Sequence, residues 1–223
     1  MVSIAWRRAT WLAAVAGLLL SFATIGLPAQ KVDEAQQRSR EAARLFEVLE
    51  LQPGMVVADV GAGGGEMSAE MAARIGPSGR VYATDISADS LRTLRALALK
   101  TPLRNVTVVE GAELTTQLPD ACCDAVFIRN VYHHFHDPGA MNRSLVAALK
   151  PGGRLAIIDF EPAAGSALPE GVPANRGGHG IRAPLVIEEL TAAGFSAPRT
   201  IMDWPDGQPP VFQRGFLVLM RKP

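Results

Sequence analysis

The chain has 223 residues, enough for one domain built around a single hydrophobic core. Hydrophobic residues make up 48% of it and charged residues 20%, a balance that excludes an intrinsically disordered chain and a membrane protein with several spans. The formal net charge is zero and the basic residues are scattered, which argues against nucleic acid as a partner.

The first 29 residues resemble a signal peptide or an N-terminal membrane anchor. Arg7 and Arg8 precede an uncharged run of 22 residues from Ala9 to Gln30, and Ser21-Phe22-Ala23 offers a small-x-small cleavage site. The run is also long enough to cross a hydrocarbon core of about 30 Å if it is not cleaved. We therefore expect an exported protein, periplasmic or secreted, or one anchored to a membrane through this segment. The folded domain is expected over residues 30–223.

Beyond this segment, apolar runs and turn residues alternate in a pattern that predicts helices and strands in turn. A helical pattern at 32–51 ends at Pro53-Gly54, and a short apolar run from Met55 to Val60 then leads into a glycine-rich loop. The elements expected after that loop are a helix at 66–75, a strand at 80–85, a helix at 89–100, strands at 106–110 and 124–130, a helix at 139–149, a strand at 154–160, a loop at 162–184, a helix at 185–193, and strands at 199–204 and 212–221.

This order predicts an α/β fold with a doubly wound, mostly parallel sheet. Right-handed crossovers between parallel strands place helices on both faces of such a sheet, and ligands bind at the carboxyl ends of its strands. The last two strands are joined by Pro205-Asp206-Gly207 and are expected to form an antiparallel hairpin. The Gly/Pro-rich loop at 162–184 fits a substrate-facing segment and an ordinary surface loop equally well.

The strongest functional signal is Asp59-Val60-Gly61-Ala62-Gly63-Gly64-Gly65, which lies directly after a strand and before a helix. Glycines let the backbone approach a ligand closely, and a helix N-terminus offers unpaired N–H groups to a carboxylate. A dinucleotide fingerprint would require glycine where Glu66 stands. An acid before the first glycine also favours a ligand with an ammonium and a sulfonium over a pyrophosphate. We predict cofactor contacts from Asp59, Gly61, Ala62, Gly63 and Gly65.

Two further strand ends are expected to complete this site. Asp85 closes the second strand, 26 residues after Asp59, where a carboxylate can accept hydrogen bonds from both ribose hydroxyls. Ile86 follows it and is placed to lie against an adenine ring. The third strand ends at a turn containing Gly111 and Ala112, and the Ala112 backbone amide is expected to meet the adenine edge.

These residues, together with Asp124-Ala125-Val126-Phe127 and Lys150-Pro151-Gly152-Gly153, resemble the class I S-adenosylmethionine-dependent methyltransferases, and most of all the small-molecule group related to quinone-biosynthesis enzymes. The resemblance covers residues 41–223. It implies a Rossmann-like sheet of seven strands with an antiparallel last strand, S-adenosyl-L-methionine as cofactor and a small-molecule methyl acceptor. It also implies that the glycine loop lines methionine, Asp85 ribose and Ala112 adenine, although the family often has an acid at the last position.

A histidine-rich segment, Asn130-Val131-Tyr132-His133-His134-Phe135-His136, follows the fourth strand, beside the expected position of methyl transfer. Asn130 is predicted to contact the cofactor. Because histidine titrates near neutral pH, His133 or His134 is a candidate catalytic base for a hydroxyl or an acidic carbon; alternatively, the segment caps the strand with one buried histidine. Nearly consecutive histidines do not readily converge on one ion, so we expect no metal site. His179, in the loop at 162–184, is a further candidate for substrate contact.

The two cysteines, Cys122 and Cys123, are adjacent in the sequence. Neighbouring residues rarely reach disulfide geometry, so we predict two unlinked, buried residues at the start of a strand.

Two alternatives to small-molecule methyl transfer fit the same sequence. One is a noncatalytic protein that binds S-adenosylmethionine, which a test for turnover would separate from an enzyme. The other is a lipid or quinone methyltransferase tethered to a membrane by its N-terminus, which fractionation would distinguish.

Overall fold

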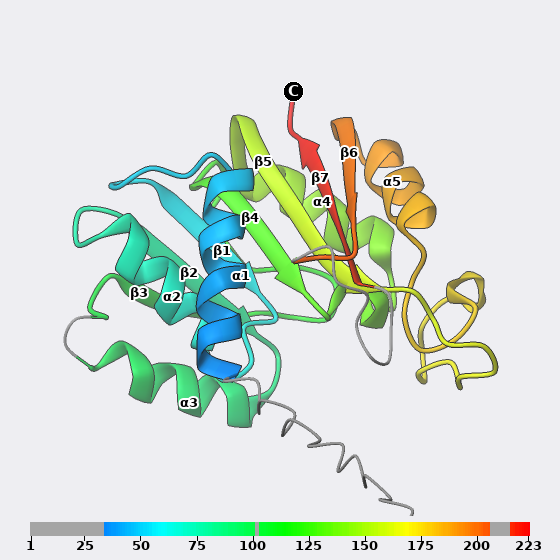
Figure 1. Ribbon diagram of the computed structural model, residues 1–223, viewed down its shortest axis with the longest axis horizontal. Coiled ribbons are helices and arrows are strands. Elements are labelled where there is room, and N and C mark those ends of the chain that lie inside the picture. Colours follow the sequence, from blue (N-terminus) through cyan, green and yellow to red (C-terminus); the bar gives the residue numbers. More distant parts are fainter. Residues whose placement is uncertain (1–33, 101–102, 206–214) are drawn as a thin grey trace, which may run out of the picture. The chain divides into compact units, whose positions relative to one another are not determined.

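A seven-stranded sheet forms the centre of the computed structural model, which describes residues 34–100, 103–205 and 215–223 (Figure 1). The strands are β1 (Val56–Val60), β2 (Arg80–Asp85), β3 (Val106–Glu110), β4 (Cys123–Arg129), β5 (Leu149–Phe160), β6 (Ser196–Met202) and β7 (Gly215–Arg221). The helices are α1 (Glu34–Val48), α2 (Glu66–Ile75), α3 (Ala88–Ala98), α4 (Pro138–Ala148) and α5 (Ala183–Ala192), with two short 3-10 turns, η1 (Tyr132–His134) and η2 (Ala174–Arg176).

The strand order is β3-β2-β1-β4-β5-β7-β6. Strands β1 to β5 pair in parallel with their neighbours, and β7 pairs antiparallel with both β5 and β6. The predicted α/β fold, with a mostly parallel sheet and an antiparallel last strand, is therefore confirmed. The turn proposed at Pro205-Asp206-Gly207 lies mainly outside the described residues.

Helices cover both faces of the sheet (Figure 1). One core packs side chains of α1, α2 and α3, such as Leu45, Met71 and Leu94, against the sheet. The other packs α4 and α5, through Leu145 and Leu190, against the opposite face. Alternate strand residues enter the two cores, as the pleat of a strand requires. This doubly wound arrangement leaves the carboxyl ends of β1, β2, β4 and β5 available for a ligand site.

Strand β5 begins five residues earlier than the sequence predicted, at Leu149 instead of Arg154. Leu149 pairs with Cys123, and after a shift in register the ladder continues from Ala125 and Arg154. The intervening Lys-Pro-Gly-Gly turn is held by the C-terminal segment, since the Gly152 amide donates to the Lys222 carbonyl over 3.0 Å. The Lys-Pro-Gly-Gly sequence is typical of a turn outside a strand, but here its pairing makes it part of β5.

The segment at 162–182 is a loop, as predicted, and it contains η2. Arg176 of η2 is buried and forms an ion pair with Glu189 of α5, in which Nη1 and Oε1 are 2.5 Å apart. The Tyr132 hydroxyl donates to the same carboxylate over 3.0 Å and accepts from the Asn142 amide over 2.8 Å. These contacts tie the loop to η1, α4 and α5.

The prediction of unlinked cysteines is wrong. Cys122 and Cys123 are joined by a disulfide, immediately after Ala121, whose backbone adopts a left-handed conformation with φ of 47°. Cys123 is fully buried at the start of β4, as expected, whereas Cys122 is only half-buried.

The predictions for residues 1–29 lie outside the described residues. Among the helices of the described ranges, none is both long and apolar enough to cross a membrane.

Candidate functional site

Two cavities lie at the carboxyl ends of the parallel strands and meet at Gly61, which lines both. The first has a volume of about 560 Å³ and the second about 190 Å³. Four predicted cofactor residues line the first cavity: Asp59, Gly61, Ala62 and Asn130. Four others line the second together with Gly61: Asp85, Ile86, Gly111 and Ala112. Gly63 and Gly65 line neither cavity, so their contribution to the site is indirect.

Two glycines of the loop, Gly61 and Gly65, approach neighbouring side chains too closely to carry a side chain of their own. The Gly61 amide donates to the Thr84 carbonyl over 2.8 Å, and φ of Gly61 is +77°. A Cβ atom on Gly61 would lie 2.6 Å from Cγ2 of Val131, and one on Gly65 would lie 2.7 Å from Cδ2 of Leu94. Glycine is required here both for its backbone conformation and for the close approach of neighbouring side chains.

Asp85 both shapes the loop and faces the second cavity. Its Oδ2 accepts from the Gly63 amide over 2.9 Å, and its Oδ1 accepts from the Ser87 amide over 2.8 Å. An ionised carboxylate has about four lone-pair positions, so it can accept further hydrogen bonds from a ligand. Beside it, the apolar side chain of Ile86 is 63% exposed, which suits a surface that a flat ring would cover.

The backbone amide of Ala112, which we expect to meet adenine, already has a partner within the chain. This amide donates to the Thr115 carbonyl over 2.9 Å, and the two residues form an isolated antiparallel bridge. The turn after β3 closes on itself, so the Ala112 amide is already used. Ala112 still lines the second cavity.

Asp59 is buried at the end of β1, 2% exposed, and its Oδ2 accepts from the Ser68 hydroxyl over 2.6 Å. Burial raises the pKa of Asp59 to about 7, and the Ser68 hydrogen bond and the Arg129 charge only partly oppose this effect. Near neutral pH, this carboxyl group is therefore in balance between its neutral and ionised forms. A cation bound beside it would favour the ionised form.

The raised pKa of Asp59 makes the stability of the domain depend on pH. Because the folded pKa of about 7 exceeds the ordinary aspartate value of 3.8, the folded state holds a proton that the unfolded state has lost between these values. The contribution of Asp59 to the free energy of unfolding is complete below about pH 4. It falls by roughly 1.4 kcal/mol per pH unit between about pH 4 and 7 and is lost above about pH 7.

Asp59→Asn is expected to remove this part of the pH dependence, because asparagine can still accept the Ser68 hydrogen bond but does not titrate. Urea unfolding of both proteins at intervals from pH 4 to 8 measures the difference. Identical pH profiles for the two proteins would contradict the assignment.

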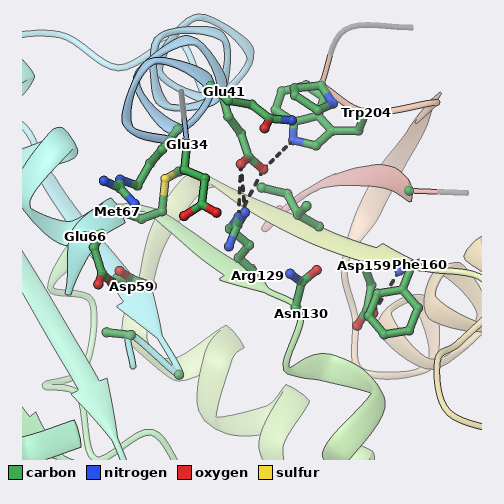
Figure 2. Close-up of a pocket in the computed structure, with 17 residues that line it drawn as sticks. Glu34, Glu41, Asp59, Glu66, Met67, Arg129, Asn130, Asp159, Phe160 and Trp204 are labelled. Carbon is green, nitrogen blue, oxygen red and sulfur yellow. Dashed lines mark hydrogen bonds and ion pairs between the residues drawn. The ribbon is translucent and has the colours of Figure 1, made fainter. Parts of the chain in front are cut away.

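A cluster from α1, β4 and the end of β6 closes the first cavity and was missed by the sequence analysis. The Glu41 carboxylate accepts from Arg129 Nε over 3.1 Å and from Trp204 Nε1 over 3.0 Å (Figure 2). Glu41 is buried on the same helical face as Leu45. An acid one turn before a core leucine was a signal that could have identified it. Trp204 carried no such signal, because only the folded chain brings it to α1.

The first cavity is acidic. Two arginines, Arg38 and Arg129, stand against five acids, and Figure 2 shows Glu34 and Glu66 facing the same space as Asp59. The lining acids are Glu34, Glu41, Asp59, Glu66 and Asp159. With Glu41 already paired to Arg129, the remaining carboxylates favour a ligand that carries positive charge.

The histidines occupy different environments. His133 is 1% exposed and its Nδ1 lies 2.8 Å from Oδ1 of Asp159, which matches the alternative in which one histidine is buried and hydrogen bonded. Its Nε2 lies 3.2 Å from Nε2 of His179, a residue from the loop at 162–182. Both ring nitrogens of His133 are thus engaged. His134 is exposed and lines the second cavity. The partial removal of its ring from water, followed by the charges of His133 and His179, lowers its pKa.

Asp159 was not predicted as a site residue, although it lies next to the carboxyl end of β5, much as Asp85 lies at the carboxyl end of β2. Its Oδ2 accepts from the His133 amide over 3.1 Å and its Oδ1 from the Phe160 amide over 2.9 Å. Asn130, predicted as a cofactor contact, lies on the first cavity with a left-handed backbone, φ of 57°, and its amide donates to the Ile158 carbonyl over 2.8 Å. Asparagine tolerates this conformation better than most residues.

Comparison with known proteins finds a matching domain family, relatives in sequence and similar solved structures. A family model described as a methyltransferase domain matches residues 58–157. A demethylmenaquinone methyltransferase of Listeria monocytogenes is 34% identical over 114 residues, which are 51% of this chain and 48% of that protein. A ubiquinone/menaquinone biosynthesis C-methyltransferase of Shewanella frigidimarina is 32% identical over 116 residues, 52% of this chain and 46% of that protein. The chain therefore spans about half the length of the curated relatives it matches.

Among solved structures, a SAM dependent methyltransferase from Aquifex aeolicus is 25% identical, with a TM-score of 0.65, over 84% of this chain and 93% of that one. A phosphoethanolamine N-methyltransferase of Haemonchus contortus, solved with S-adenosyl-L-methionine, is 16% identical and shares the fold, with a TM-score of 0.64 over 84% of this chain and 52% of that one. With the glycine loop, the strand order and the matched domain, these likenesses agree with the resemblance seen in the sequence. Residues 58–157 match a methyltransferase domain, and the chain is similar to S-adenosylmethionine-dependent methyltransferases, those of quinone biosynthesis included.

Proposed function

We propose that this protein transfers a methyl group from S-adenosylmethionine to a small molecule. The observation that carries the proposal is the pair of cavities of different character that meet at Gly61, one rich in carboxylates and one with more apolar walls. A ligand with a cationic amino-acid end and a flat aromatic end matches this pair.

The residues present fit the cofactor. In the first cavity, Asp59 and Glu66 complement an ammonium and a sulfonium, and the N-terminus of α2 offers backbone amides to a carboxylate. In the second, the free lone pairs of Asp85 suit ribose hydroxyls, and Ile86 offers an apolar surface to adenine. S-adenosylmethionine, when bound, supplies a methyl group already activated on a sulfonium.

The task of the protein in such a reaction is alignment, because methyl transfer is an in-line displacement. The first cavity extends from the glycine loop past Asn130 to Phe160 and Trp204. We assign its end near Asp59 to the methionine part of the cofactor and its end near Phe160 and Trp204 to the acceptor. The two aromatic side chains would hold a planar or apolar acceptor and exclude water from the reacting atoms.

The proposed catalytic bases are His133 and His134, but their environments suit different roles. His133 has no free ring nitrogen, so we assign it to positioning. His134 is exposed and lines the second cavity, so of the two it is the better candidate for accepting a proton.

The test of the proposed function is turnover to S-adenosylhomocysteine. The full-length chain is incubated with S-adenosylmethionine and a panel of quinols, phenols, amines and thiols, including a soluble demethylmenaquinol analogue. Acceptor-dependent formation of S-adenosylhomocysteine supports the proposal. Cofactor binding without turnover on any of the panel would favour the noncatalytic alternative.

A membrane-tethered quinone methyltransferase is a second candidate function. It is favoured by the uncharged run from Ala9 to Gln30 and by the names of the curated relatives, which act in menaquinone or ubiquinone biosynthesis. Fractionation of cells expressing the full chain tests it. Retention in the membrane fraction after a high-salt wash supports tethering, and release as a shortened soluble form contradicts it.

Asp85→Ala is expected to weaken binding of S-adenosylmethionine by about 1.5–3 kcal/mol, the usual value of a hydrogen bond to a charged group. This corresponds to roughly a tenfold to hundredfold increase in Kd, measured by calorimetric titration. Asp89→Ala is the matched control, because Asp89 lies four residues away on the exposed face of α3, with its side chain 82% exposed. Unchanged affinity in a folded Asp85→Ala protein would refute the ribose assignment.

A further inference from the structure

Three histidines from two distant segments converge beside the acceptor end of the site. His133 and His134 belong to η1, and His179 comes from the loop before α5. One ligand nitrogen from each of the three lies within 4.8 Å of the others. In the sequence, His133 and His134 are followed closely by His136. In the folded chain the His136 ring lies instead against Gly171, where a Cβ would be 2.8 Å from its Cε1 atom.

The distances suit a tetrahedral metal ion. With metal–nitrogen bonds of about 2.0–2.1 Å, two nitrogen ligands of a tetrahedral zinc ion are about 3.3 Å apart. Nε2 of His133 and Nε2 of His179 are 3.2 Å apart. No two of the three ligand nitrogens are more than 4.8 Å apart. Because His134 and His179 are exposed, their side chains can rotate to bring the nitrogens to metal-binding distance without disturbing the core.

The buried carboxylate of Asp159 orients the cluster. It already accepts from the His133 and Phe160 backbone amides, so it is an acceptor toward the His133 ring as well. Nδ1 of His133, 2.8 Å from Oδ1 of Asp159, therefore carries the proton. The lone pair of His133 Nε2 then points toward His179. Histidines that bind metals almost always donate their other ring N–H to a carboxylate or a carbonyl in this way.

The backbone around His179 is fixed by two glycines. Gly178 and Gly180 have φ of +144° and +129°, and both are buried. A Cβ on Gly180 would lie 2.8 Å from the Phe160 carbonyl oxygen, so only glycine allows the loop to pack this closely against the end of β5. The His179 amide donates to the Ser166 hydroxyl over 3.0 Å. The third histidine is thus held near the other two by the structure of the loop.

We propose that His133, His134 and His179 bind one divalent transition-metal ion, most suitably Zn²⁺, with Asp159 orienting His133. Three imidazole ligands leave a fourth position for water or an acceptor atom, as in catalytic zinc sites. The inference concerns binding of the ion and does not rest on methyl transfer. This proposal replaces the expectation of no metal site. That expectation rested on histidines that are close in the sequence, whereas His179 lies 46 residues after His133.

The test is a Co²⁺ titration of the untagged full-length chain after treatment with EDTA and dialysis, followed by visible absorption, with Zn²⁺ as competitor. The expected result is one Co²⁺ per chain, with the strong absorption of four-coordinate cobalt, displaced by one Zn²⁺. His134→Ala and His179→Ala are each expected to raise the Kd by more than about a hundredfold, and Asp159→Asn by about tenfold to a hundredfold.

His136→Ala is the matched control, because it removes an exposed histidine two residues from His134 and outside the cluster. It is expected to bind Co²⁺ as the unmodified chain does. Circular dichroism checks that each variant is folded; both ligand variants change exposed side chains. Absence of four-coordinate cobalt in the unmodified chain, or unchanged affinity in His179→Ala, would overturn the proposal. Binding of S-adenosylmethionine to the same metal-free sample is measured in parallel, so a failure of this proposal is distinct from a failure of the proposed function.

Discussion

Arg176→Met is expected to lower the free energy of unfolding by about 3–5 kcal/mol, the usual cost of removing one partner of a buried ion pair. The Arg176 side chain is fully buried and that of Glu189 is 14% exposed, so the substitution leaves a carboxylate that water can reach only poorly. The same change removes a cation from above the Tyr132 ring, 5.9 Å from its centroid. Urea denaturation followed by circular dichroism measures the loss.

The matched control for this prediction is Arg92→Met on α3. Arg92 and Asp89 also form an ion pair, but their side chains are 68% and 82% exposed. Exposed pairs contribute about 0–1 kcal/mol, so this substitution is expected to change stability very little. Similar small losses in both variants would mean that the Arg176 pair does not anchor the loop at 162–182.

Gly61→Ala is expected to weaken binding of S-adenosylmethionine by about a hundredfold, or roughly 2.7 kcal/mol. The new Cβ would lie 2.6 Å from Val131 Cγ2, so the Val131 side chain must move. Because Gly61 and Val131 both line the cavity of about 190 Å³, the displaced valine would occupy space assigned to adenine. Calorimetric titration of the folded variant gives the change in Kd.

Gly152→Ala is the control for backbone strain in the Gly61 experiment. Gly152 has φ of +75°, close to the +77° of Gly61, but a Cβ there would meet nothing within 4 Å. Both substitutions carry a conformational cost of about 1–2 kcal/mol, and only Gly61→Ala is expected to lose affinity. Adding Val131→Ala to Gly61→Ala is expected to restore part of the binding. Equal affinities of the Gly61 and Gly152 variants would contradict the proposed position of the cofactor.

The elements around the glycine loop could be predicted closely, because their signals are local. Helix α2 and strands β2 and β3 have the predicted bounds, since apolar runs and turn residues define their ends. Asp85 was found because an acid at the end of a parallel strand points to the ligand edge of a sheet. Asp159 carried a similar signal at β5, but no glycine loop or neighbouring motif marks that strand as part of the site.

Other parts of the site could not be predicted because they depend on contacts between distant segments. Glu41, Arg129 and Trp204 meet only after α1 has packed beside β4 and the end of β6. His179 reaches His133 through a loop whose course is set by the Arg176 ion pair and by two glycines with positive φ. The bridge between Ala112 and Thr115 closes a turn that the sequence pattern does not reveal.

The central claim is that the paired cavities bind S-adenosylmethionine. Calorimetric titration of the full-length chain with this ligand, and separately with NAD, tests the claim most directly. We predict one binding site of micromolar affinity for S-adenosylmethionine and no heat of binding with NAD. Binding of NAD, or no binding of S-adenosylmethionine to the folded protein, would contradict it.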